Sequence, residues 1–202
     1  PEQGFTNNEL RTPIGIEGRT VKRNAPTLLN VGLLPRLFHD ARESRLEHQA
    51  WSPLLAHNEM GNPSIAFVLE ELAGLPGYAA EFAAAFPDEP QPSMQTVGAA
   101  LAAYERALLA GDSAFDRWHY GGDDDAVPAS VKRGHALFTG KAGCSACHTI
   151  GEDAALFTDF GLHNTGVGFR QTMHDARAAT LDVAVAPGTR LAVETTHIAA
   201  SS

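Results

Sequence analysis

The two cysteines of this 202-residue chain lie within one short motif, Cys144-Ser145-Ala146-Cys147-His148. Cysteines this close in sequence cannot link distant parts of a fold, so the pair predicts a site and not a structural cross-link. The C-x-x-C-H spacing is typical of covalent haem attachment. On one helical turn the two thiols can reach the two vinyl groups of a porphyrin, while the histidine offers its imidazole to the iron. The motif therefore predicts a haem bound by Cys144, Cys147 and His148.

Other interpretations of the motif remain open. A structural zinc site needs two more ligands of matching spacing, and the chain has no second cysteine pair. A thioredoxin-like redox pair leaves His148 without a role, and chance occurrence is the last alternative. On the other side of the iron, His163 and Met173 are the candidate ligands within the chain, although a methionine in an irregular segment more often fills a gap or lies on the surface.

Composition limits the partners and the architecture. The chain has 15 basic and 24 acidic residues and a net charge of −9, which is the wrong sign for binding nucleic acid. Its apolar runs are shorter than the roughly 18 to 20 residues that a membrane span needs. Glycine and proline are frequent, with 19 and 12 residues, so we expect short elements joined by loops.

Apolar spacing and helix-capping residues predict several helices. The predicted ranges are residues 43–52, ended by Pro53; 65–72, with Pro63 in the first turn; 77–86; a longer helix that follows Ser93 and stops before Gly111; and 129–138. The predicted buried stripe of the longer helix comprises Val97, Leu101, Tyr104 and Leu108. The acidic, glycine-containing run at residues 121–125 is the clearest linker, and we place a domain boundary there.

Further sequence blocks follow one another along residues 1–167. They are residues 22–30 (KRNAPTLLN), 46–50 (LEHQA), 58–62 (NEMGN), 111–117 (GDSAFDR), 136–148, 157–159 (FTD) and 163–166 (HNTG). In this order the blocks resemble the bacterial di-haem cytochrome c peroxidases and the related MauG proteins. The ensemble is more specific than the C-x-x-C-H motif, which alone indicates only a c-type cytochrome.

This resemblance implies a mostly α-helical chain of two tandem cytochrome c-like domains with long loops, here residues 1–120 and 126–202. In the family each domain carries a haem, and a calcium ion lies between them. The N-terminal haem reacts with peroxide and the C-terminal haem relays electrons. By resemblance, Cys144, Cys147 and His148 hold the relay haem, Gln49 and Glu59 lie on the distal side of the peroxidatic haem, and Asn24 belongs to the calcium site.

The chemistry of peroxide cleavage suits these two residues. A carboxylate such as Glu59 can take a proton from one peroxide oxygen and deliver it to the other, and the Gln49 amide can orient the peroxide. Without the resemblance, an ordinary exposed acid in a turn and a solvated helix residue would be the more common interpretations of Glu59 and Gln49.

Three departures from the family pattern stand out. The N-terminal attachment motif would fall before Pro1, so the chain resembles a fragment that lacks the peroxidatic haem's cysteines and proximal histidine. His39 stands where the family has a tryptophan between the haems. The residue that completes the relay haem would lie beyond Ser202. Residues 1–38 also contain no histidine, as in the MauG-like branch, whose peroxidatic iron is open without prior reduction.

The expected activity is periplasmic reduction of hydrogen peroxide, with electrons from a small redox protein (a cytochrome c or a cupredoxin) or from a protein substrate. A mono-haem electron-transfer protein without peroxidase activity is the main alternative, and a scaffold-like or sensory haem module is a third. A C-x-x-C-H motif encoded upstream of Pro1 would favour the enzyme, and its absence would favour the electron carrier.

Overall fold

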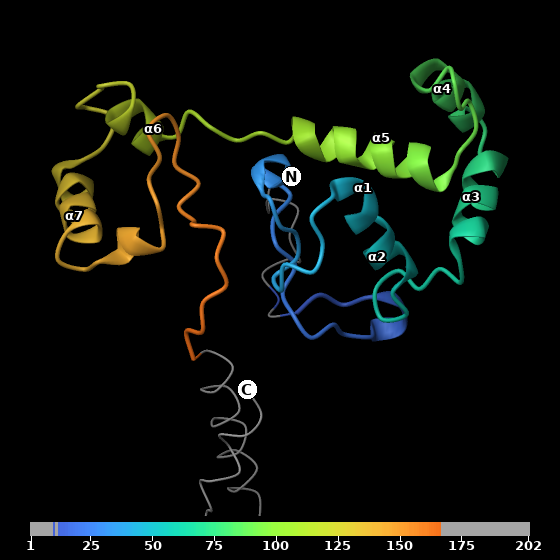
Figure 1. Ribbon diagram of the computed structural model, residues 1–202, viewed down its shortest axis with the longest axis horizontal. Coiled ribbons are helices and arrows are strands. Elements are labelled where there is room, and N and C mark those ends of the chain that lie inside the picture. The colour runs from blue at the N-terminus through green and yellow to red at the C-terminus, as the bar shows by residue number, and fades with distance from the viewer. Residues whose placement is uncertain (1–9, 11, 167–202) are drawn as a thin grey trace, which may run out of the picture. The chain divides into compact units, whose positions relative to one another are not determined.

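The computed structural model describes Leu10 and residues 12–166, in which short helices are separated by long loops (Figure 1). Their order is η1 (Ile16–Gly18), η2 (Val31–Leu33), α1 (Leu46–Gln49), α2 (Trp51–Leu55), α3 (Ile65–Gly74), α4 (Tyr78–Ala85), α5 (Met94–Ala107), α6 (Ala114–His119), α7 (Ala129–Thr139) and η3 (Cys144–Ala146). These described residues form no strand; two isolated bridges join Ile14 to Thr20 and Leu37 to Glu43. The expected mostly helical class is confirmed. The chain divides after Gly161 into two structural units, and all of these helices belong to the first.

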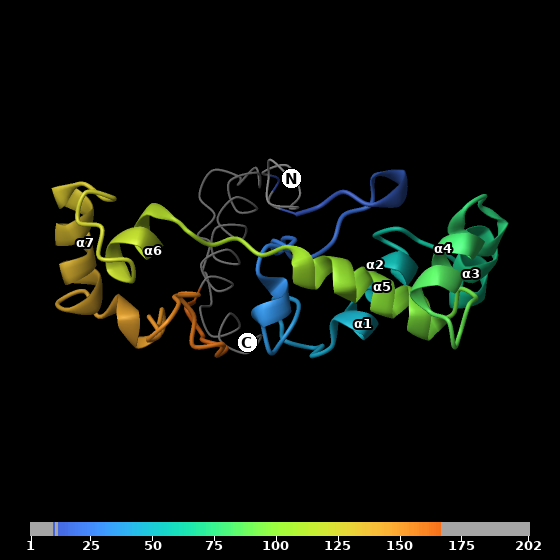
Figure 2. The same cartoon turned by 90° about the horizontal axis from the view of Figure 1, so that it is seen from above.

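Helix α5 is the longest of the described helices, and it begins as predicted. The Ser93 hydroxyl accepts a hydrogen bond from the Thr96 amide, while the Thr96 hydroxyl accepts one from the Ser93 amide, which forms a capping box. Helix α1 packs directly on α5, and both views show the two side by side (Figures 1 and 2). The approach is close because Gly98 faces α1: a Cβ atom there would lie 2.5 Å from the Glu47 carbonyl oxygen.

The predicted buried stripe of α5 is wrong beyond Val97. Leu101 and Tyr104 are exposed, at 39% and 56%, and the buried face instead comprises Thr96, Val97, Gly98, Ala102 and Glu105. Small residues let the helix backbones approach, and this packing outweighs the burial of larger side chains. The helix also ends earlier than predicted, since Leu108 is its C-cap and Gly111 lies outside it.

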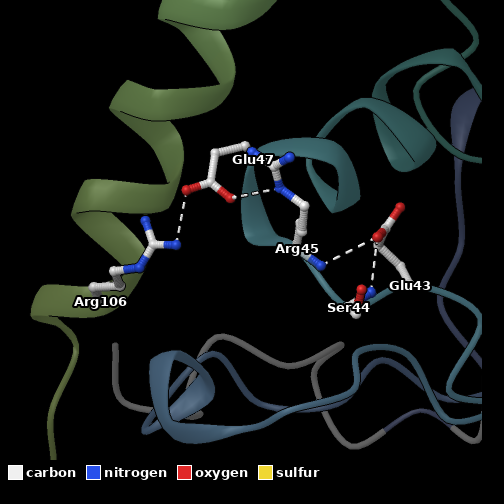
Figure 3. A network of polar contacts seen from close by, with 5 residues as sticks. All are labelled: Glu43, Ser44, Arg45, Glu47 and Arg106. Atoms are coloured by element: carbon white, nitrogen blue, oxygen red, sulfur yellow. Dashed lines mark hydrogen bonds and ion pairs between the residues drawn. The ribbon is translucent and has the colours of Figure 1, made fainter.

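The segment predicted as one helix over residues 43–52 forms two shorter helices. It starts late because the Glu43 carboxylate accepts hydrogen bonds from the amides of Ser44 and Arg45, which holds these residues in a turn (Figure 3). Pro53 does not end the segment as predicted, because it lies in the first turn of α2, where a helix amide has no partner within the helix.

An ion pair also joins α1 to α5 across their packed faces (Figure 3). One Arg106 guanidinium nitrogen lies 2.7 Å from the Glu47 carboxylate, and the Arg45 Nε lies 3.9 Å from the other oxygen of that carboxylate. The pair lies beside a core cluster of Val31, Leu37, Leu46 and Ala102. The first core of the fold therefore combines apolar contacts with a polar link between the same two helices.

A second core cluster consists of Trp51, Phe82 and Val97, with partly buried residues of α3 packed against it. The Trp51 indole donates a hydrogen bond to the Met94 carbonyl at 3.1 Å, which joins α2 to the start of α5. Helices α3 and α4 match their predictions to within two residues, but Ser64 caps α3 and Pro63 lies before the helix. Helix α5 thus contributes a buried residue to each of the two core clusters.

Helices α6 and α7 precede the cysteine motif. Helix α6 was not predicted; a capping box of Ser113 and Asp116 starts it. Helix α7 forms as predicted, one residue longer. Among the described residues, no helix combines the length and apolarity that crossing a bilayer demands.

Candidate functional site

A cavity of about 840 Å³ opens beside α1, α2 and α5. Pockets that hold cofactors usually measure about 300 to 1,000 Å³ and combine an apolar lining with a few polar groups. The lining here comes from the segments around residues 13–15, 21–28, 38–42, 49–54 and 58–60, together with Leu101 and Glu105 of α5. Residues far apart in the sequence therefore meet at one cavity.

The two residues predicted to act on peroxide both line this cavity. Gln49 is the last residue of α1, and Glu59 lies in the turn that follows α2. Both side chains are half-buried. The structure thus brings Gln49 and Glu59 to one cavity, while their position beside a haem and the chemical role of each remain predictions.

The turn that carries Glu59 is held by the N-terminal loop around residues 14–20. The Ile16 amide donates to the Glu59 carbonyl at 2.7 Å, and the Arg19 guanidinium donates to the His57 carbonyl at 2.8 Å. Gly15 permits this contact, since a Cβ atom there would lie 2.3 Å from the Asn58 carbonyl oxygen. The N-terminal loop, which includes η1, therefore fixes the backbone position of Glu59.

Asn24 and His39 also line the cavity, and both are exposed. The Asn24 side-chain oxygen accepts a hydrogen bond from the Ala25 amide at 2.8 Å. Its assignment to a calcium site stays a prediction. His39 lies in a strained turn, because Phe38 and Ala41 on either side have φ values of 64° and 56°.

Basic side chains lie beside the apolar part of the cavity. Arg42 lies 2.7 Å and Arg23 3.2 Å from the Asp40 carboxylate. A hydrogen bond from Arg42 is the main cause that lowers the pKa of Asp40. With Lys22 also in the lining, the cavity holds three cations and an apolar wall, a combination that fits an apolar ring system with acidic substituents, such as haem.

The cysteine motif forms a 3₁₀ turn, close to the single helical turn expected from the sequence. Gly143 precedes it with a φ of 67°, and the His148 amide donates to the Cys144 carbonyl at 3.0 Å. Both cysteines are free thiols; Cys144 is half-buried and Cys147 is exposed. These groups are therefore available for the two thioether bonds of a c-type haem.

The orientation of His148 also fits an iron ligand. Its Nδ1 lies 2.9 Å from the Phe157 carbonyl oxygen. A proton on Nδ1 that is donated to this carbonyl leaves Nε2 with the free electron pair that a metal needs. The Phe138 ring lies beside the imidazole, with centroids 6.2 Å apart, and the Phe157 ring packs against Phe138. Of the candidate sixth ligands, Met173 lies outside the described residues and His163 belongs to the second structural unit, so both remain predictions.

Two features of the structure were missed by the sequence analysis. One is Glu105, a buried acid that lines the cavity. The other is a cluster of rings before the cysteine motif, in which Trp118 and His135 have centroids 5.1 Å apart, as do Phe115 and His119. A charged residue between helical apolar positions was the only sequence signal for Glu105, and the block at 111–117 was the only one for the ring cluster.

Comparison with known proteins supports the resemblance. A family model described as "Di-haem cytochrome c peroxidase" matches residues 1–125. The chain is 40% identical over 167 residues to the methylamine utilization protein MauG of Methylorubrum extorquens, covering 83% of this chain and 45% of that protein. It is 35% identical over 157 residues to the cytochrome c551 peroxidase of Pseudomonas aeruginosa, covering 77% of this chain and 44% of that protein.

Comparison with solved structures also finds a di-haem peroxidase. The diheme peroxidase BthA from Burkholderia thailandensis is similar with a TM-score of 0.65 and 29% sequence identity, over 75% of this chain and 42% of that chain. The chain thus spans about half the length of the curated relatives it matches. The family model covers more than half of the chain, and the matched relatives are c-type haem peroxidases and MauG proteins. From its sequence and its fold, this chain belongs to the di-haem cytochrome c peroxidase family.

Proposed function

We propose that this chain forms part of a periplasmic di-haem peroxidase that reduces hydrogen peroxide. Residues 1–120 would form the peroxidatic domain, and residues 126–202 would form a second cytochrome c-like domain that carries a relay haem on Cys144, Cys147 and His148. The main support is the cavity of about 840 Å³, which gathers Gln49, Glu59 and Asn24 from three separate segments of the chain.

A haem bound in this cavity would supply the iron at which peroxide is reduced. The residues present fit such a group: Leu28, Pro53 and Leu54 offer apolar contacts, and the cations beside Asp40 suit haem propionates. Asn24 would contribute its side-chain oxygen to a calcium ion, a ligand type that calcium prefers.

The chain's own residues would manage the protons of the reaction. Reduction of one hydrogen peroxide to two water molecules consumes two protons and two electrons. The Glu59 carboxylate takes the proton from one peroxide oxygen and delivers it to the other, so that the second oxygen leaves as water. The Gln49 amide donates a hydrogen bond that orients the peroxide.

Electrons would come from a small redox protein, a cytochrome c or a cupredoxin, or from a protein substrate. The hydrogen bond from His148 Nδ1 to the Phe157 carbonyl keeps the imidazole oriented and strengthens it as an iron ligand. This bond therefore suits an iron ligand, as the proposed relay haem requires.

A substitution of Glu59 tests this function in the full-length, haem-loaded protein. We expect Glu59→Gln to slow the peroxide-driven change in the haem spectrum by about 100-fold or more, because the amide cannot accept the proton. The matched control is Glu71→Gln, at an exposed position of α3. The relay haem should keep its reduced spectrum in both variants.

A mono-haem electron-transfer protein is the second candidate, since a haem on Cys144, Cys147 and His148 could transfer electrons without a second haem. If the full-length protein binds one haem, and its spectrum does not respond to peroxide, this alternative replaces the peroxidase. If Glu59→Gln reacts with peroxide as fast as the wild type, Glu59 has no part in the mechanism.

A further inference from the structure

A second carboxyl group lies in the wall of the cavity, on α5. Glu105 is only 8% exposed, although acidic residues are rarely buried without a partner. Its Oε2 has no hydrogen-bond partner within the part of the chain that the structure describes. A buried polar atom without a partner is costly, and protonation of the carboxyl group reduces that cost.

The packing of α5 keeps Glu105 in this position. Ala102 is fully buried, and Gly98 faces the Glu47 backbone, so this side of the helix cannot turn away from α1. Leu101 and Glu105 are one helical turn apart and line the cavity together. Helix α5, which contributes to both core clusters, therefore holds the Glu105 carboxyl in the cavity wall.

Burial favours the neutral form of Glu105. Burial is the main cause that raises its pKa; Arg106 lowers the pKa and Glu47 raises it. Arg106, the neighbouring cation, is already bound to the Glu47 carboxylate at 2.7 Å, so it neutralises another acid (Figure 3). The other charged or titratable groups of the cavity are Lys22, Arg23, His39, Asp40, Arg42 and Glu59.

Building on the proposed peroxidase function, we propose that Glu105 is a positioning residue that holds a proton in reserve for Glu59. Its carboxylic O–H donates a hydrogen bond into the cavity, to a water molecule that would bridge Glu105 and Glu59. Glu59 only moves a proton between the two peroxide oxygens, so both protons consumed per peroxide must enter from elsewhere. Glu105 passes them one at a time through the bridging water and is protonated again from solvent after each transfer. The two electrons come from the redox partner named above.

The first test measures protonation without measuring activity. Urea unfolding of the full-length, haem-loaded protein is compared with Glu105→Gln between pH 4 and pH 8, with Glu71→Gln as the control. A raised pKa means that the folded protein keeps a proton that the unfolded chain releases. The wild type therefore loses stability as pH rises from the pKa of Glu105 in the unfolded chain to its pKa in the folded protein. The urea midpoint of Glu105→Gln, relative to the wild type, should therefore increase with pH, while that of the control stays constant.

A relative midpoint of Glu105→Gln that does not change with pH would overturn the proposal, because Glu105 would then titrate as it does in the unfolded chain. Infrared spectra give a second measure. The wild type at neutral pH should show the carbonyl band of a protonated carboxylic acid, and Glu105→Gln should lose that band. Persistence of the same band in the variant would assign it to another group and contradict the proposal.

The second test concerns the link to Glu59. The single-turnover rate with peroxide should fall at high pH in the wild type as Glu105 loses its proton. Glu105→Gln should be about tenfold slower at neutral pH and should lack this inflection, while Glu105→Asp should restore it. If Glu105→Gln has the same pH profile as the wild type, the role of Glu105 is refuted, but the proposed peroxidase function is not. A wild type whose haem spectrum does not respond to peroxide would instead refute the proposed function, and the unfolding data would still report on the protonation of Glu105.

Discussion

At the scale of single residues, Glu47 shows how one side chain can serve two elements. Its carboxylate binds Arg106 of α5, while its backbone carbonyl faces Gly98 of the same helix. Its own backbone amide, and then Arg106, lower the pKa of Glu47. The pair is largely exposed, with half of the Arg106 side chain in solvent, so solvent screens most of the attraction.

A double-mutant cycle with Glu47→Gln and Arg106→Gln should therefore give a small coupling energy, about 0.5 kcal/mol at pH 7, by urea unfolding. Because the folded-state pKa of Glu47 is lowered, this stabilisation is present above the pKa of the unfolded chain and disappears as pH falls through the folded value. The same cycle with Arg45→Gln, whose Nε lies 3.9 Å from the carboxylate, should give less. A coupling that persists unchanged in strong acid would contradict this account.

At the scale of elements, α5 organises the first core and supplies Val97 to the second. Its buried face contains glycine and alanine where larger apolar residues were predicted, since α1 packs against its backbone. The position of Gln49 at the cavity depends on this contact, because Gln49 is the last residue of α1. Changes at the contact should therefore affect both stability and the cavity.

Gly98→Ala tests the contact between α1 and α5. The new Cβ would lie 2.5 Å from the Glu47 carbonyl oxygen, and a backbone atom cannot rotate away, so we expect a loss of about 2 kcal/mol in the free energy of unfolding. The control is Gly74→Ala in α3, where a Cβ meets no atom within 4 Å; it should be neutral or stabilise by up to about 1 kcal/mol. Equal effects of the two substitutions, measured by urea unfolding, would rule out close packing at Gly98.

At the scale of the whole molecule, a covalent haem would link the cysteine motif to the proposed chemistry. The free thiols of Cys144 and Cys147 and the orientation of His148 fit one c-type haem on this chain. The family carries two haems, and the chain spans about half the length of its curated relatives.

Haem content therefore tests the assignment. After maturation by a cytochrome c assembly system, a pyridine haemochrome assay and intact mass should give one covalent haem for this chain and two for the full-length protein. Cys144→Ala together with Cys147→Ala should remove one haem from each, because no thioether bond can form. Colourless wild-type protein with two titratable thiols would end the haem interpretation.

Local sequence was a good guide wherever a local interaction determines structure. Ser93 caps α5 as predicted, because its hydroxyl binds an amide three residues away. Local rules were wrong at Pro53 and at Tyr104. Pro53 lies inside α2 because its first turn needs no amide donor, and Tyr104 is exposed because α5 packs through its small residues.

The sequence by itself determined the haem motif, the family and the mostly helical class, because each depends on residue types at short, ordered spacings. Only the tertiary structure decided that Gln49, Glu59 and Asn24 share a cavity, and that Glu105 lies in its wall. These residues come from segments with no local interaction between them. Their meeting depends on the close approach of α1 to α5 and on two loops joined by backbone and side-chain hydrogen bonds, and local sequence patterns do not encode such long-range contacts.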